Sequence, residues 1–105
     1  MQDMRMHLTA LLSSRDRTVG RCLESLRIPR PTETIAPETL DWPPEIVERA
    51  FALSRRLGNN EVGSAHLLLA FLDSRPEKVR AFLEVDGATC ARLREALHSV
   101  LSLGE

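Results

Sequence analysis

A segment near the start of this chain recurs sixty residues later in diverged form. When residues 4–27 are aligned with residues 64–87, apolar positions and several polar positions coincide. A repeat at a fixed offset indicates one supersecondary unit used twice, each copy covering the apolar face of the other. The identical pairs are Leu8/Leu68, Ala10/Ala70, Leu12/Leu72, Ser14/Ser74, Arg15/Arg75, Val19/Val79, Leu23/Leu83 and Glu24/Glu84.

The spacing of apolar residues predicts helices throughout the rest of the chain. Apolar side chains recur at i, i+3 and i+4, and the alternation typical of strands is absent. Residues 29–42 differ, because three prolines among threonines and acids indicate an extended connector. The sequence therefore predicts an all-α domain with helices near 4–14, 15–27, 43–57, 64–72, 76–86 and 90–101.

Several residues are suited to begin or end these helices. Glycine tolerates the left-handed conformation that follows many helices, so Gly58 is expected to end the third helix and Gly87 the fifth. Short polar side chains can accept hydrogen bonds from the first free backbone N–H groups. The expected caps are Asp41 for the third helix, Ser64 for the fourth, and Asp86 or Thr89 for the sixth.

The second copy carries motifs in a recognisable order. Arg56-Leu57-Gly58 is followed by a polar turn, then by Val62-Gly63-Ser64-Ala65-His66 and a leucine-rich run over 67–72. These motifs follow one another without gaps. Their order resembles that of the Clp N-terminal domain, the substrate- and adaptor-binding module of ClpA- and ClpC-type unfoldase ATPases. The resemblance extends from about Trp42 to Leu103 and implies a pseudo-repeat of short helices.

The first copy is shortened relative to this family. It lacks the opening helix, and the connector stands where the fourth helix is expected. We predict one domain over 1–105, with a degenerate first repeat of about two helices (4–28), a connector (29–42) and a four-helix second repeat (43–103). The missing helices are expected to leave apolar surface uncovered, which favours a homo-oligomer or a permanent partner.

Charge is balanced overall but uneven along the chain. The formal net charge is -1, yet residues 1–30 carry six arginines against three acids, and residues 31–50 carry five acids against one arginine. Either the acidic connector lies near the basic first helices, or the arginines form a docking face. The net charge and the lack of interleaved aromatic residues disfavour nucleic acid as a partner.

No motif in the chain predicts catalysis, a metal or a cofactor. The glycines of 58–64 have the spacing of a phosphate-binding loop, but the lysine that reaches the phosphates is absent. His66 has no second ligand at a workable spacing, and the resemblance implies a structural histidine. Cys22 and Cys90 fall at apolar positions and are expected to be buried thiols in a reducing compartment.

In the ClpC branch, the glutamate preceding this histidine in each repeat helps to bind phosphorylated arginine. The matching positions here are Ala65 and Arg5, neither of which can accept from a guanidinium, so this specificity is not expected. A peptide-binding surface remains the prediction, with Trp42 as an aromatic anchor or as a packing residue at the start of the third helix. The candidate partner-binding residues are Arg5, Trp42, Glu61, Ser64 and Ala65.

The sequence as a whole predicts a non-enzymatic protein-interaction module in a bacterial cytoplasm. Its expected partners are proteins: a Clp ATPase, an adaptor, an unfolded polypeptide or another Clp N domain. No segment has the apolar length needed to span a bilayer. The alternatives are an excised terminal domain of a larger Clp ATPase and a nucleic-acid-binding helical domain.

Overall fold

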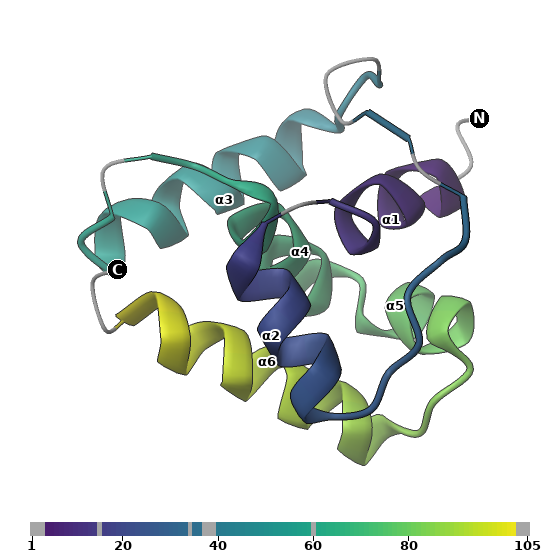
Figure 1. Cartoon of the computed structure of the whole chain (residues 1–105). Helices are drawn as coiled ribbons and strands as arrows, with labels where there is room; N and C mark the ends of the chain where they lie inside the picture. The colour runs from purple at the N-terminus through teal and green to yellow at the C-terminus, as the bar shows by residue number, and fades with distance from the viewer. Residues whose placement is uncertain (1–3, 15, 34, 37–39, 60, 103–105) are drawn as a thin grey trace.

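The computed structural model describes residues 4–14, 16–33, 35–36, 40–59 and 61–102 (Figure 1). Within these ranges the chain forms six α-helices and no strand, which confirms the predicted all-α class. None of the described helices is long and apolar enough to cross a membrane. The helices are α1 (Met4–Leu12), α2 (Arg17–Ser25), α3 (Pro44–Arg56), α4 (Ser64–Ser74), α5 (Pro76–Leu83) and α6 (Gly87–Ser102).

Helix α4 lies at the centre of the domain and packs against each of the other five helices (Figure 1). Its leucine-rich run explains this position, because a helix that is apolar on most sides is stable only when it is surrounded. Seven of its residues are buried: Ala65, His66, Leu68, Leu69, Ala70, Phe71 and Leu72.

The connector packs over α1 and fastens its end. Ile28, immediately before the connector, is buried in the core, and the guanidinium of Arg30 within it donates hydrogen bonds to the carbonyls of Leu12 and Ser14. These carbonyls belong to the last turn of α1 and the residues after it, where the helix itself provides no donors. Farther along the connector, the Asp41 carbonyl accepts from Nε2 of His7 at 2.7 Å.

The apolar surface expected from the shortened first repeat is largely covered. Among the described residues only Met6 and Phe51 are large apolar side chains with about half of their surface exposed, at 50% and 51%. In the described part of the chain, the strongly exposed apolar surface is therefore limited to these two side chains, Met6 on α1 and Phe51 on α3.

Two of the predicted helix ends are confirmed. Gly58 has a φ of 75°, and the N–H of Asn59 returns to the carbonyl of Ser54, so α3 ends with a left-handed residue as expected. At the start of α6, Oδ1 of Asp86 accepts from the N–H of Thr89 at 2.8 Å. Asp86 is thus the cap of the sixth helix.

Three predicted helix ends are wrong, each because a neighbouring residue takes the position. Pro43 is the N-cap residue of α3 and no side chain caps it, so Asp41 does not have this role. Gly63 is the N-cap residue of α4, and Ser64 is already the first helical residue. Helix α5 stops at Leu83 because Glu84 takes the left-handed conformation (φ 56°), and Gly87 begins α6 instead.

Candidate functional site

The turn between α3 and α4 is organised around His66. Its Nδ1 accepts from the backbone N–H of Gly63 at 3.0 Å, so Nε2 carries the proton and donates to Oδ1 of Asn59 at 2.8 Å. The amide nitrogen of Asn59 in turn donates to the Leu101 carbonyl near the end of α6, at 3.2 Å. This network confirms the structural interpretation of the histidine, because both ring nitrogens are used within the fold.

A buried hydroxyl completes the turn. Oγ of Ser54 lies 3.1 Å from the carbonyl oxygen of Asn59 and 3.2 Å from that of Glu61. Its single proton can be donated to either of these loop carbonyls, or shared between them. The loop is fixed by the protein's own polar groups, and this is the geometry of a helix-to-helix connection.

The beginnings of α2 and α4 meet at Asp16. Its Oδ1 accepts from the N–H groups of Thr18 and Val19 and so caps α2. Its Oδ2 lies 3.2 Å from where a Cβ on Gly63 would stand, so a side chain at that position would require the carboxylate to shift by a few tenths of an ångström. Burial lowers the pKa of His66, and the nearby Asp16 carboxylate partly opposes this shift. The histidine is therefore favoured in its neutral form, as its accepting Nδ1 requires.

Both cysteines are buried as expected. Burial raises the pKa of the Cys22 thiol, with a further upward contribution from Asp16, and burial likewise raises the pKa of the Cys90 thiol. A raised pKa keeps the thiol protonated and poorly nucleophilic. Within the described ranges, no group of three histidine, cysteine or acidic residues is placed to hold a metal ion.

Arg5 and Trp42 lie near the start of α1. The Trp42 ring makes an edge contact with the His7 ring, and their centroids are 4.7 Å apart. The centroids of the Trp42 and Phe71 rings are 6.2 Å apart. Trp42 is partly buried and packs against the core, beside His7 of α1 and Phe71 of α4. Arg5 is exposed.

The remaining three predicted residues, Glu61, Ser64 and Ala65, lie at or just before the start of α4. Ala65 is only 1% exposed and offers no surface to a partner, whereas Ser64 is partly exposed and Glu61 is exposed. Phe71, beside which Trp42 packs, follows Ala65 by six positions, or roughly 9 Å along the helix axis. The structure therefore brings Arg5 and Trp42 to one region and Glu61 and Ser64 to another.

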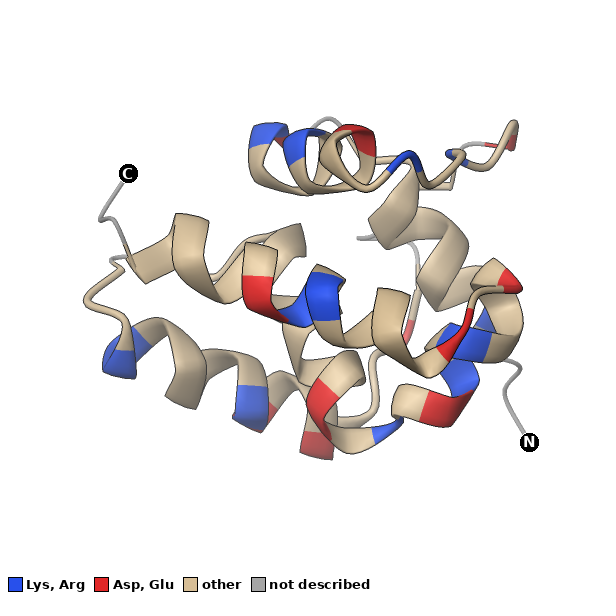
Figure 2. Cartoon of the chain, turned by 90° about the horizontal axis from the view of Figure 1, so that it is seen from below, with Lys and Arg blue, Asp and Glu red and all other residues tan. Residues whose placement is uncertain are grey.

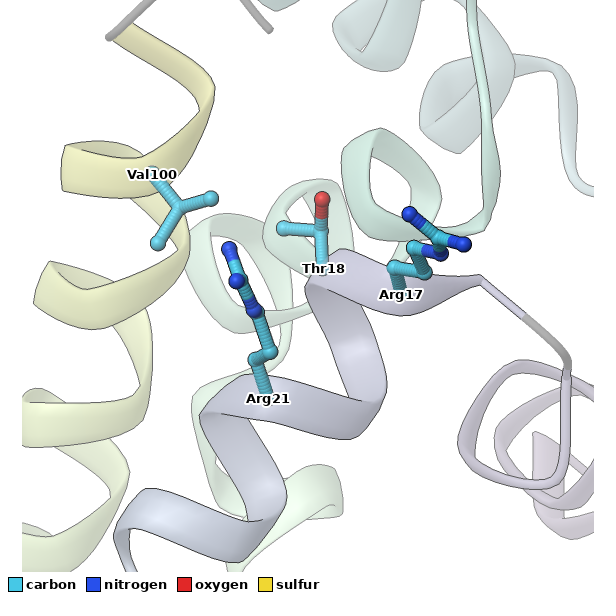
Figure 3. Close-up of a pocket in the computed structure, with 4 residues that line it drawn as sticks. All are labelled: Arg17, Thr18, Arg21 and Val100. Atoms are coloured by element: carbon cyan, nitrogen blue, oxygen red, sulfur yellow. The ribbon is translucent and has the colours of Figure 1, made fainter.

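The sequence did not single out a pocket between α2 and α6. Figure 3 shows it lined by Arg17, Thr18 and Arg21 from α2 and by Val100 from α6, and its volume is about 490 Å³. The only signal for it in the sequence was the arginine excess of residues 1–30. That excess does not indicate which arginines line a pocket. The pocket forms only where α2 packs on α6, which brings Val100 opposite the arginines.

A family model described as Clp repeat (R) N-terminal domain matches residues 44–105, which is more than half of the chain. The chain belongs to the Clp repeat N-terminal domain family. No curated protein and no solved structure matches it.

The match covers four of the six described helices of this Clp N domain. It begins at the first residue of α3 and takes in α4, α5 and α6, while α1 and α2 fall outside it. The His66 network therefore lies within the matched repeat, and the pocket joins the matched and unmatched parts. Clp N domains are non-catalytic interaction domains that bind proteins such as adaptors and substrates.

Proposed function

We propose that this chain is a non-enzymatic protein-binding module of the Clp N type. It binds adaptors, unfolded clients or other Clp N domains in regulated proteolysis or chaperoning, in a bacterial cytoplasm. The match of residues 44–105 to the Clp repeat N-terminal domain supports this function. The fold adds a physical basis, since a rigid helical core presents fixed side chains at its surface at little entropic cost.

The surface proposed for protein binding lies at the start of α1. Met6 is half exposed there, next to Arg5, and Trp42 packs close by against His7. An exposed methionine adapts to irregular apolar partners, and a cation beside it favours an acidic rim on the partner. Glu61 and Ser64 form a second polar region at the start of α4, which is proposed as a separate contact.

Phosphorylated arginine is not proposed as a ligand of this surface. A carboxylate must receive the guanidinium, and the matching positions hold the buried Ala65 and the cationic Arg5. The specificity proposed here is for apolar and acidic peptide features.

An affinity pull-down from bacterial lysate tests this function. The bait is the tagged 105-residue chain, with Arg5→Glu and Met6→Asp as parallel baits and the exposed Arg55→Glu on α3 as a charge-matched control. Enrichment of a Clp ATPase, its adaptors or poorly folded clients, lost with the two α1 variants and kept with Arg55→Glu, supports the proposal. Recovery of the bait alone from lysates that contain these proteins refutes it.

A terminal domain of a larger Clp ATPase is the second candidate, favoured by the same family match. The coding DNA beyond Glu105 distinguishes the two directly. Nucleic-acid binding is the weaker alternative, because Figure 2 shows the Asp and Glu positions interspersed with the Lys and Arg positions along the helices. Retention on duplex DNA at physiological salt would favour it.

A further inference from the structure

Two arginines and a threonine line one side of the pocket between α2 and α6. Arg17 and Arg21 are four residues apart, so they lie on the same face of α2, and Thr18 lies beside them. Figure 3 shows the Thr18 hydroxyl between the two guanidinium groups in this view, with Val100 facing them from α6. The pocket is thus lined by three donor side chains from α2 and by one apolar side chain from α6.

The two guanidinium groups have no carboxylate partner among the described ion pairs. Those pairs join Arg75 to Glu45 and Arg94 to Asp73, both elsewhere in the domain. Like charges one helical turn apart repel each other, by an amount similar to the attraction of an opposite pair. An anion between the guanidinium groups would replace this repulsion with two attractions.

We propose that this pocket binds a carboxylate of an acidic peptide segment in a partner protein. Arginine matches the planar geometry of a carboxylate and can donate two parallel hydrogen bonds to it. The Thr18 hydroxyl adds a third donor, and Val100 packs against the aliphatic part of the segment. The pocket volume, about 490 Å³, is that of roughly sixteen waters, which leaves room for the residue that carries the carboxylate.

The local charge favours a carboxylate over a phosphate. Asp16 immediately precedes Arg17, and its carboxylate already accepts from the N–H groups of Thr18 and Val19. Those N–H groups are the donors with which a helix start would bind phosphate, and here they are occupied. The Asp16 charge also repels a phosphate dianion more strongly than a singly charged carboxylate.

This inference deepens the proposed function and rests on it for the nature of the ligand, a protein segment. The pocket is distinct from the α1 surface, so the two are tested separately. If the lysate experiment fails but acidic peptides bind here, the proposed function fails and the pocket stands.

Fluorescence anisotropy with labelled peptides is the direct test. One peptide has alternating glutamate and leucine with an amidated end, a second replaces each glutamate by glutamine and keeps a free terminal carboxylate, and a third is neutral and amidated. We expect the first or second to bind, which distinguishes side-chain from terminal carboxylates, and the third not to bind. Raising salt from about 50 to about 300 mM should weaken binding, because exposed charges are screened.

Substitutions of the lining residues test whether the peptides bind in this pocket. Arg17→Gln with Arg21→Gln should weaken binding by about tenfold or more, while the charge-matched Arg55→Gln with Arg56→Gln stays within about twofold. Val100→Glu supplies a competing carboxylate inside the pocket and should also abolish binding. Circular dichroism should show the arginine variants folded, since these residues are exposed on their helices. The same measurement checks Val100→Glu, because Val100 is partly buried against the core.

Three outcomes overturn the proposal. They are equal loss of binding with both arginine pairs, no binding of either carboxylate peptide, and a phosphoserine peptide that binds more than about tenfold more tightly than the glutamate peptide. The last result would make the pocket a phosphate site.

Discussion

Replacement of His66 by alanine should destabilise this domain more than replacement of His98 by alanine. His66 accepts from the Gly63 N–H and donates to the Asn59 side chain, and Asn59 holds the end of α6. Alanine breaks both histidine hydrogen bonds. It also leaves two polar groups without their partner, beside a site that is only 5% exposed.

The magnitude follows from these bonds. Each hydrogen bond contributes about 1 kcal/mol net, and a buried polar group left unpaired costs about 1–3 kcal/mol. Partial access of water to the loop reduces this cost, so we expect the free energy of unfolding to fall by about 2–4 kcal/mol. For a domain of this size the melting temperature should then fall by about 10–20 °C.

The same histidine should make stability depend on pH. Burial holds the pKa of His66 in the folded state below the 6.5 of an unperturbed histidine. Between these two pKa values the unfolded chain binds a proton that the folded chain does not. The stabilising contribution is therefore fully present above about pH 6.5, and it is lost as the pH falls toward the lowered pKa of the folded state.

Urea unfolding followed by circular dichroism measures both effects, with Trp42 emission as a second probe of the core. His98→Ala is the matched control, because His98 is only partly buried on α6. Equal destabilisation by His66→Ala and His98→Ala would refute the role of the network. So would an unchanged acid dependence in His66→Ala, since the fall in stability below pH 6.5 should be smaller in that variant.

Four further predictions concern helix ends and thiols. Gly58→Ala should lower the free energy of unfolding by about 1 kcal/mol through backbone strain alone, because φ is 75° and nothing lies within 4 Å of the added Cβ. Glu84→Gly should raise the free energy of unfolding by a similar amount in the same urea assay, because Glu84 has a φ of 56°. Asp16→Ala removes the cap of α2 and should cost about 1 kcal/mol; it should also lower the pKa of His66 further in an NMR titration, and an upward shift would contradict the assigned geometry. Cys22 and Cys90 should react with a thiol reagent only slowly until urea unfolds the domain, and rapid labelling of the native protein would contradict their burial.

The sequence predicted the helices well and their ends less well. The helical period identified all six elements, because an apolar stripe is needed whatever the partner helix is. The ends depend on which of several adjacent residues takes the cap or the left-handed conformation. Gly63 rather than Ser64 precedes α4, and Glu84 rather than Gly87 follows α5, since free-energy differences between such choices are small and are set by packing.

The sequence likewise predicted some features of the candidate binding residues and not others. Their selection followed motif positions in the two copies, which carry no information on burial or on the direction in which a side chain points. Ala65 is buried because α4 is surrounded by helices, and Trp42 packs on Phe71 because the connector returns across α1. Met6 was not selected, although its exposure makes it the apolar centre of the proposed α1 surface.

By itself the sequence determined the all-α class, the family and the structural role of His66, since periodicity and contiguous motifs are local properties of the chain. Only the tertiary structure showed that the connector covers α1 and that Arg17, Arg21 and Val100 share a pocket. These features join residues far apart in sequence. They arise from how α2 lies against α6 and how an aperiodic segment fills the remaining surface, which no local pattern encodes.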